Sequence, residues 1–349
     1  MDRPQVLLLH TGGTLGMRRG PSGYMPAPGH LAELLASMPE LDRPELPRFR
    51  LVEHAPLLDS SDMRPHDWQR VADTLVAEQD GADGFVVLHG TDTMAYTASA
   101  LAFLLEGLDR PVVLTGSQIP LAEVRSDARE NLVTALLLAA RPDLAEVGVY
   151  AGGRLLRGVR ATKTSTAGFE PFESPGEPPL GHAGVTVELD TARLRPAGAG
   201  PLRARRLRDA QVLALRLFPG IGAETLGNVL REPVEGMVLE AYGAGNAPRD
   251  PELLEVLAEA SARGVVIVAV TQCLRGGVRM RDYATGSALA EAGVVSGGDM
   301  TAEAALTKLL YLLSRERDPA RVRALLGHDL RGELRADARG APVPETDPT

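Results

Sequence analysis

The segment that most constrains the fold runs from Gly84 to Ser99, G-F-V-V-L-H-G-T-D-T-M-A-Y-T-A-S. Phe85 to Leu88 is a short apolar run with two adjacent valines, which is typical of a strand buried on both faces of a sheet. It ends at His89-Gly90, and Thr91-Asp92-Thr93 then precede an Ala/Leu-rich helical stretch. Open α/β sheets place ligands where a strand ends and a helix begins. This turn therefore predicts either a reactive site or a polar cap on the helix.

A second turn of the same kind lies near the N-terminus. Val6 to Leu9 is an apolar strand followed by His10-Thr11-Gly12-Gly13-Thr14. The glycines permit a tight turn and a close approach of backbone, which presents Thr14 beyond the strand end. Alone, such a turn could merely reverse the chain. Together, Thr14 and Thr91-Asp92 are interpreted as parts of one site.

Strands and helices alternate through the first 150 residues. Further strands are predicted at Pro111–Thr115 and Val147–Ala151, with a helix at Asp127–Ala140. This order predicts an α/β fold: a larger N-terminal domain, residues 1–191, with a mostly parallel sheet and covering helices.

A smaller Rossmann-like α/β domain is predicted over residues 211–334. An Arg/Pro/Gly/Ala-rich linker, 192–210, precedes it, and a disordered tail, 335–349, follows it. The elements expected in the smaller domain are strands at Val212–Leu217, Met237–Ala241 and Val265–Val270 and helices at Glu252–Ala262 and Thr301–Ser314.

Composition excludes several classes of function. The net charge of −9 argues against a nucleic-acid partner. The single cysteine, Cys273, fits a reducing compartment, and no secretory signal or membrane-length apolar stretch is present, so we expect a cytoplasmic protein with no membrane partner. The seven histidines form no i, i+4 pair and no phosphate-loop motif occurs, so we expect no metal and no cofactor.

Lysine is rare in this chain. Basic residues total 37, yet only Lys163 and Lys308 are lysines. Arginine keeps its proton in proteins, whereas a partly desolvated lysine can act as a base. Lys163 lies among hydroxyl residues in Arg160-Ala-Thr-Lys-Thr-Ser-Thr166, which favours a chemical role over that of a solvated surface charge.

Two further segments are candidates for the same site. Gly16–Pro28 has no periodicity and is predicted to be a mobile loop, in which Tyr24 is either a lid residue with a catalytic hydroxyl or a packing anchor. Asp59-Ser60-Ser61-Asp62 precedes a helix, and we expect Ser61 or Asp62 to be its N-cap, which would leave Asp59 and Ser60 for another role.

These residues suit acyl transfer to water. A threonine hydroxyl needs a base or a hydrogen-bond relay to become a nucleophile, and a desolvated lysine can supply one. Backbone N–H groups of a glycine turn can stabilise an oxyanion. The sequence thus predicts a hydrolase.

The same residues resemble a known family. T-G-G-T at Thr11–Thr14 and H-G-T-D-T at His89–Thr93 are similar to the two signatures of the bacterial-type L-asparaginases, in particular their cytoplasmic type I members. Supporting stretches follow in the same order between Val6 and Ser314. They are Asp59–Met63, Leu114–Pro120, Thr162–Thr164, Tyr242–Pro248 and Gly298–Ala304.

The resemblance implies roles residue by residue. Thr14 would attack the side-chain amide of L-asparagine and form a β-aspartyl ester, with Tyr24 beside it. Lys163 would polarise Thr91, and Asp92 would receive the substrate's α-ammonium group. The α-amino and α-carboxylate groups would be held by Asp59, Ser60 and Ser61. Ser117 is a weaker candidate, and which threonine acts in each half-reaction stays open.

The resemblance also implies assembly and regulation. Members form homodimers that usually pair into tetramers, and Asn246 would reach a partner subunit's site. Some cytoplasmic members bind a second asparagine through an arginine at the position of Glu240, with the segment matching Thr271-Gln272-Cys273. A carboxylate there would repel the effector's carboxylate, so we expect asparagine activation to be lost or altered.

Two other functions are alternatives to this one. One is an amidase component acting on aminoacyl-tRNA, which would need an RNA-binding region and a basic surface. The other is a catalytically inactive sensor of asparagine or aspartate, which the presence of every expected catalytic residue disfavours. Glutaminase side activity depends on one methylene in the pocket, worth about 1–3 kcal/mol, and is not readable from the sequence.

Overall fold

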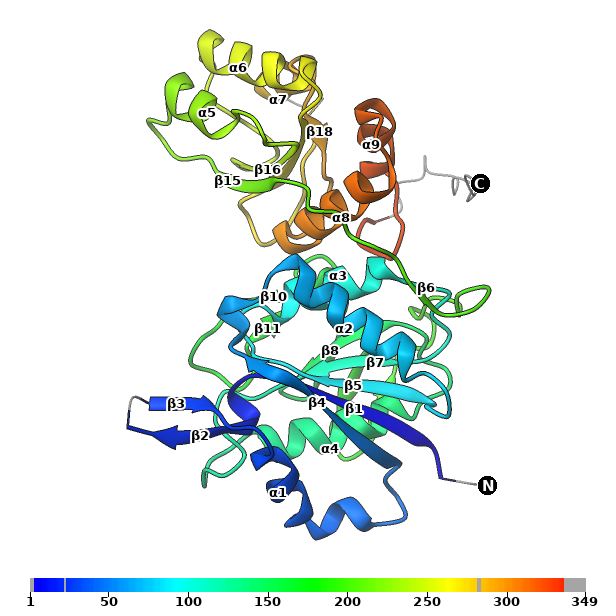
Figure 1. The fold of residues 1–349 in the computed structure, drawn as a ribbon. Coiled ribbons are helices and arrows are strands. Elements are labelled where there is room, and N and C mark those ends of the chain that lie inside the picture. Colours follow the sequence, from blue (N-terminus) through cyan, green and yellow to red (C-terminus); the bar gives the residue numbers. More distant parts are fainter. Residues whose placement is uncertain (1–2, 22, 281–283, 336–349) are drawn as a thin grey trace. The chain divides into compact units, whose positions relative to one another are not determined.

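A computed structural model describes residues 3–21, 23–280 and 284–335 of the chain. The chain forms two compact units, and the boundary between them falls between Arg206 and Leu207. The α/β prediction is confirmed in both units, each of which contains a sheet covered by helices (Figure 1).

The first unit is built on an eight-stranded sheet in the order β13-β12-β9-β8-β7-β5-β1-β4. The five strands from β8 to β4 are parallel, and β9, β12 and β13 continue the sheet antiparallel at one edge. The sheet strands are β1 Gln5–Gly12, β4 Arg48–Leu58, β5 Gly84–Leu88, β7 Val112–Thr115, β8 Val147–Ala151, β9 Arg154–Arg157, β12 Gly181–Ala183 and β13 Val187–Leu189.

Helices cover both faces of this sheet, and short strand pairs and 3₁₀ turns join its elements. The helices are α1 His30–Ala36, α2 Pro65–Ala77, α3 Met94–Leu104 and α4 Ala128–Ala139. The strand pairs are β2 Met17–Gly20 with β3 Gly23–Pro26, β6 Leu105–Glu106 with β14 Arg203–Ala204, and β10 Thr162–Lys163 with β11 Phe172–Glu173. The 3₁₀ turns are η1 Thr14–Gly16, η2 Pro39–Asp42, η3 Ser60–Asp62 and η4 Gly158–Arg160.

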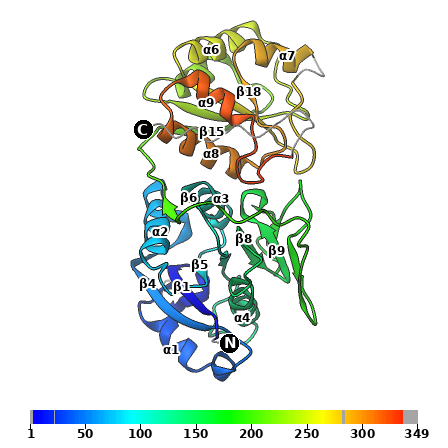
Figure 2. The same cartoon turned by 90° about the vertical axis from the view of Figure 1, so that its right-hand side faces the viewer.

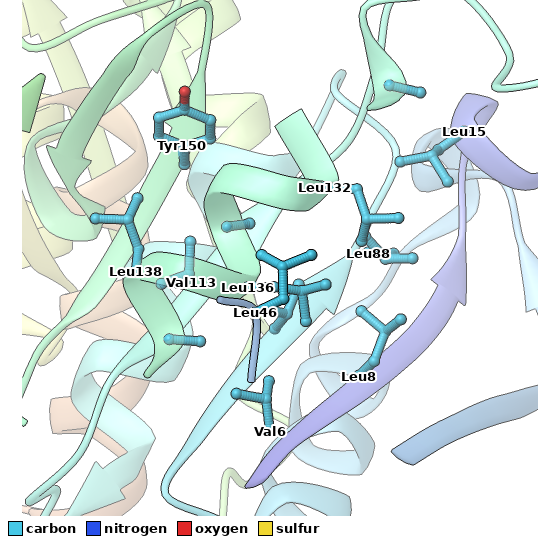
Figure 3. Close-up of a cluster of buried hydrophobic side chains, with 14 of the residues drawn as sticks. Val6, Leu8, Leu15, Leu46, Leu88, Val113, Leu132, Leu136, Leu138 and Tyr150 are labelled. Carbon is cyan, nitrogen blue, oxygen red and sulfur yellow. The ribbon is translucent and has the colours of Figure 1, made fainter. Parts of the chain in front are cut away.

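The central strands are apolar on both faces because helices pack on both. All five residues of β5 are buried, as the unbroken apolar run predicts. Figure 3 shows the core on one face, where Leu8 and Leu88 of the sheet lie near Leu132 and Leu136 of α4. Leu31 and Leu35 of α1 belong to the same cluster. Helices α2 and α3 lie over the opposite face (Figure 1).

The order of the strands places a topological switch point at the carboxyl ends of β1 and β5. These strands are neighbours, but α1 follows β1 on one face of the sheet and α3 follows β5 on the other (Figure 1). Where successive connections leave neighbouring strands on opposite faces, the carboxyl ends of those strands bind ligands. The turns that follow β1 and β5 contain Gly13-Thr14 and Gly90-Thr91, respectively.

Two local predictions are wrong. The segment Gly16–Pro28 is not an irregular loop, because Met17–Gly20 and Gly23–Pro26 pair antiparallel as β2 and β3. Gly20 and Gly23 face each other at the end of this hairpin, and Gly23 has φ +111°. Two closely spaced glycines are typical of a hairpin turn, but the prediction considered only the lack of helical periodicity.

The second error concerns the start of α2. Neither Ser61 nor Asp62 caps this helix, whose N-cap residue is Arg64 with Pro65 following. The Arg64 N–H donates to Asp67 Oδ2 at 2.9 Å, so a carboxylate in the first turn accepts the N–H of the N-cap residue. Asp59 instead caps the short η3 turn, where Ser61 N donates to Asp59 Oδ1 at 2.9 Å.

The second unit has a four-stranded parallel sheet in the order β15-β16-β17-β18. Helices α5, α6 and α7 cover one face of it and α8 and α9 the other (Figures 1 and 2). The strands are β15 Val212–Arg216, β16 Gly236–Ala241, β17 Val266–Thr271 and β18 Val295–Ser296, and the helices are α5 Ala223–Val229, α6 Pro251–Ala262, α7 Ala284–Glu291, α8 Ala302–Arg315 and α9 Pro319–Leu326. Each strand and helix predicted for this part of the chain is confirmed to within one residue at either end.

A buried ion pair fixes the end of the second unit. Lys308 of α8 and Glu333 have fully buried side chains, and Lys308 Nζ lies 2.7 Å from Glu333 Oε1. The same ammonium donates to the backbone oxygens of Leu326, the last residue of α9, and of His328, two residues further on. Burial lowers the pKa of Lys308, and its contact with Glu333 opposes that shift. The second lysine of the chain, Lys308, therefore has a structural role in the interior of this unit.

Of the tail predicted over residues 335–349, only Arg335 lies within the described residues.

Candidate active site

The two glycine turns of the first unit are in backbone contact. A Cβ atom on Gly13, which has φ +89°, would overlap the backbone nitrogen of Gly90. A Cβ atom on Gly90 would in turn overlap the Ser60 hydroxyl. Only glycine permits this approach. The structure thereby brings together three segments that the sequence marked separately: the Thr14 turn, the Thr91 turn and Asp59–Ser61.

Lys163 is joined to the second turn by two hydrogen bonds. Its Nζ donates to Thr91 Oγ1 at 2.8 Å and to Asp92 Oδ1 at 2.5 Å. The lysine side chain is 16% exposed and the Asp92 carboxylate 66% exposed. The ammonium is thus held against a buried threonine hydroxyl while Asp92 stays open to a ligand's cation. Strand pairing of Lys163 with Phe172 fixes the loop that carries it.

Gln118 is a site residue that the sequence reasoning missed. The Thr91 hydroxyl donates to Gln118 Oε1 at 3.2 Å, and Gln118 Nε2 donates to the backbone oxygen of Gly168, in the loop that follows Lys163. Its backbone N–H donates to the Asp127 carboxylate at the start of α4. The available signal was positional, because Gly116-Ser117-Gln118 follows β7 as the other two turns follow β1 and β5. Ser117 is 2% exposed, and its hydroxyl has no hydrogen-bond partner among the described residues.

The Asp59–Ser61 segment lies beside the Thr91 turn. Thr93 Oγ1 donates to the backbone oxygen of Ser60 at 2.7 Å, which fastens the two segments together. Asp59 and Ser61 are exposed, and the Ser61 hydroxyl donates to Asp59 Oδ1 at 2.9 Å. This carboxylate and hydroxyl are therefore accessible, although they are engaged with each other.

Tyr24 lies on the β3 strand of the hairpin. The residue is 46% exposed, and its hydroxyl donates to Glu123 Oε1 at 2.9 Å. That hydrogen bond is the largest of the effects that raise the pKa of Tyr24. The phenol is thus a protonated donor held by Glu123.

A buried histidine supports the Thr91 turn from behind. His89 is 1% exposed, with Nδ1 lying 2.7 Å from the backbone oxygen of Gly90 and Nε2 2.8 Å from Thr97 Oγ1. Burial lowers its pKa to about 4. The imidazole is therefore neutral at pH 7 and acts as a structural support for the turn.

The remaining predicted positions lie in the second unit. Glu240 is the last residue but one of β16 and forms an ion pair with Arg216 of β15, with 3.2 Å between Arg216 Nη1 and Glu240 Oε2. Thr271 ends β17, its hydroxyl donates to the backbone oxygen of Gly243, and it accepts a bond from the N–H of Cys273, whose side chain is exposed. Asn246 closes a short backbone bridge with Tyr242. These positions cluster at the carboxyl ends of neighbouring parallel strands.

Residues 3–21, 23–280 and 284–335 contain no group of three or more His, Cys, Asp or Glu side chains arranged to hold a metal ion. No helix in these ranges is both long and apolar enough to cross a membrane.

The fold and the site define an α/β protein with threonine, lysine and aspartate at the strand ends, an arrangement suited to acyl transfer. Residues 5–195 match the family model described as "Asparaginase, N-terminal", and residues 211–326 match that described as "Glutaminase/Asparaginase C-terminal domain". The chain belongs to the asparaginase family.

Relatives match along nearly the whole chain. L-asparaginase 1 of Escherichia coli K12 is 50% identical over 337 residues, covering 97% of this chain and all of the relative. The crystal structure of L-asparaginase I from Vibrio cholerae has a TM-score of 0.89 at 47% identity and covers 95% of this chain and 99% of that one. The thermostable L-asparaginase of Thermococcus kodakarensis has a TM-score of 0.85 at 35% identity, with coverage of 95% and 100%.

Proposed function

We propose that this protein hydrolyses L-asparagine to L-aspartate and ammonia. The carrying observation is the position of Lys163 Nζ, 2.8 Å from Thr91 Oγ1 and 2.5 Å from Asp92 Oδ1, beside the turn that presents Thr14. Full-length similarity to proteins named L-asparaginase supports the choice of substrate.

In the first half-reaction Thr14 is the nucleophile. Its Oγ1 bonds to the side-chain amide carbon of asparagine, the hydroxyl proton passes to the amide nitrogen, and cleavage of the C–N bond releases ammonia. The product is a β-aspartyl ester on Thr14. Tyr24 is assigned to the same half of the site. The N–H groups of the glycine turn suit an oxyanion at the attacked carbon.

In the second half-reaction water cleaves the ester. We assign the activation of this water to Thr91, whose hydroxyl contacts Lys163, a group that can accept a proton when neutral. The exposed Asp92 carboxylate receives the substrate's α-ammonium group. Asp59, Ser60 and Ser61 hold the α-amino and α-carboxylate groups, and Ser117 is a further polar contact. Water supplies hydroxyl to the acyl carbon and a proton to Thr14.

Ammonia release from L-asparagine tests the proposal, with Thr14→Ala, Lys163→Arg and, as a control, the exposed Thr191→Ala. Arginine keeps the cation for Asp92 but cannot lose its proton, so Lys163→Arg separates a base from a mere counter-ion. We expect both site variants to lose turnover by at least about 10⁴-fold while Thr191→Ala stays near wild type. A folded Lys163→Arg variant with near-normal turnover would refute the base assignment.

The alternatives predict different outcomes. A sensor would bind asparagine without releasing ammonia. An amidase acting on aminoacyl-tRNA would spare free asparagine, and the net charge of −9 disfavours a polyanionic substrate.

We also propose that the protein is a cytoplasmic homodimer or dimer of dimers in which Asn246 serves a partner's site. The family resemblance supports this assembly, and light scattering after gel filtration measures it. For the second unit, we propose that activation by asparagine is lost or altered, because the Glu240 carboxylate lies near Thr271 and Cys273.

A further inference from the structure

The carboxylate of Glu53 is connected to both ends of the β2–β3 hairpin, directly through Gly29 and indirectly through His10. Glu53 lies on β4 directly opposite His10 of β1 in the parallel register. Its Oε2 is 2.9 Å from His10 Nδ1, and its Oε1 accepts the N–H of Gly29 at 2.9 Å. Gly29 comes three residues after the end of β3, whereas His10 contacts the residue just before β2.

That residue is Gly16, the last of the turn that begins with Thr14. The His10 side chain is 1% exposed and lies directly under Gly16, where an added Cβ would be 2.7 Å from ring Cε1 and 2.8 Å from Nε2. His10 Nε2 has no hydrogen-bond partner among the described residues. Among the described residues, Glu53 is therefore the hydrogen-bond partner that orients the ring, and the ring packs directly against the Thr14 turn.

The chemistry of the pair favours a neutral ring. Burial lowers the pKa of His10, with the Glu53 contact acting in the opposite direction. A neutral ring that donates from Nδ1 to Glu53 places its bare Nε2 lone pair beneath Gly16. The contact with Glu53 then determines the ring's tautomer and orientation together.

We propose that His10 and Glu53 are positioning residues that hold the Thr14 turn and the hairpin carrying Tyr24 in register with the rest of the site. The role is indirect, since Glu53 reaches Thr14 only through His10 and Gly16, and Tyr24 only through Gly29 and the hairpin. In Figure 1, β2 and β3 extend beside α1 from the edge of the sheet formed by β4. The expected effect on turnover rests on the proposed function, whereas the positioning of the Thr14 turn and the hairpin does not depend on it.

The first test is Glu53→Gln, measured by hydrogen exchange of the β2 and β3 amides and by steady-state ammonia release. Glutamine cannot accept from both His10 and Gly29, because one end of its amide is a donor. We expect exchange in the hairpin to accelerate about tenfold or more, with exchange in α4 unchanged. We expect kcat to fall about 10- to 100-fold, and KM to change by less than about threefold, because a small misplacement of the nucleophile impairs the reaction more than binding.

Arg50→Gln is the matched control. Arg50 lies on the same strand, three residues before Glu53, and its ion pair with Glu78 is exposed on both sides. This variant should match wild type in hairpin exchange and in kcat. Glu53→Asp, which keeps two acceptor oxygens, should recover part of both losses.

Gly16→Ala tests the pair from the other side. Its Cβ would push on the His10 ring without touching Glu53, so the same pattern of faster exchange and lower kcat should result. The proposal is overturned if Glu53→Gln leaves hairpin exchange unchanged, or if its loss of kcat is matched by a general acceleration of exchange. Wild-type protein that releases no ammonia from asparagine would refute the proposed function, and hairpin exchange in Glu53→Gln would still decide whether the pair positions these segments.

Discussion

Lys308→Met should destabilise the protein by about 3 kcal/mol, because it leaves a buried carboxylate without its counter-ion. Lys308 and Glu333 are both fully buried, and the ammonium also satisfies two backbone oxygens. Removing one member of a buried ion pair costs about 3–5 kcal/mol. Glu333 keeps hydrogen bonds from the N–H groups of Leu330 and Arg331, which places the expected loss at the lower end of that range.

Urea unfolding followed by far-ultraviolet circular dichroism measures this loss. With a denaturant slope of about 2–3 kcal/mol per M, a loss of 3 kcal/mol moves the midpoint by about 1–1.5 M. Adding Glu333→Gln to Lys308→Met removes the uncompensated charge and should restore about half of the loss. The reasoning is refuted if Lys308→Met lies within about 0.5 kcal/mol of wild type, or if the double variant is no more stable than the single one.

Three other outcomes follow from the site and its surroundings. Because the pKa of buried His89 is about 4, this residue takes up a proton in the unfolded chain but not in the folded chain between about pH 4 and 6.5. His89 alone should therefore lower the free energy of unfolding by about 3 kcal/mol as the pH decreases through this window, and thermal melts should show a smaller decrease for His89→Gln than for wild type. Gly13→Ala, which forces a side chain onto Gly90, should lose at least about 100-fold in ammonia release, and near-normal turnover would contradict the backbone contact. Saturation by asparagine should be hyperbolic, whereas a sigmoidal curve that Glu240→Ala does not change would argue against the role given to that carboxylate.

Buried periodic segments were predictable from sequence because hydrophobic burial leaves a direct pattern. The runs at Phe85–Leu88 and Val265–Val270 became central strands β5 and β17. The hairpin at Gly16–Pro28 was not predictable from periodicity, since most of its side chains are exposed and its pairing depends on Gly20 and Gly23. The prediction of the N-cap of α2 was also wrong. Several residues near Ser61 can cap a helix, but α2 begins at Pro65, where Asp67 in the first turn accepts the N–H of Arg64.

For the site, residue chemistry was more informative than local structure. The rarity of lysine and the two glycine turns were enough to bring Thr14, Thr91, Asp92 and Lys163 into one prediction. Gln118 was missed because its part depends on a contact with Thr91 from 27 residues away. The support given by His10 was equally hidden, since a histidine in an apolar strand has the same sequence pattern whether or not it faces a carboxylate.

The placement of the two lysines has a practical consequence for attaching this protein to polymers or solid carriers. Amine-directed coupling normally reaches harmless surface lysines, but here Lys308 is inaccessible and Lys163, 16% exposed, lies at the site. Apart from the chain's amino terminus, such reagents would therefore modify the residue whose chemistry matters most, while the arginine-rich exterior would not react. Replacing a few exposed arginines by lysine would give the coupling chemistry other targets and spare the site.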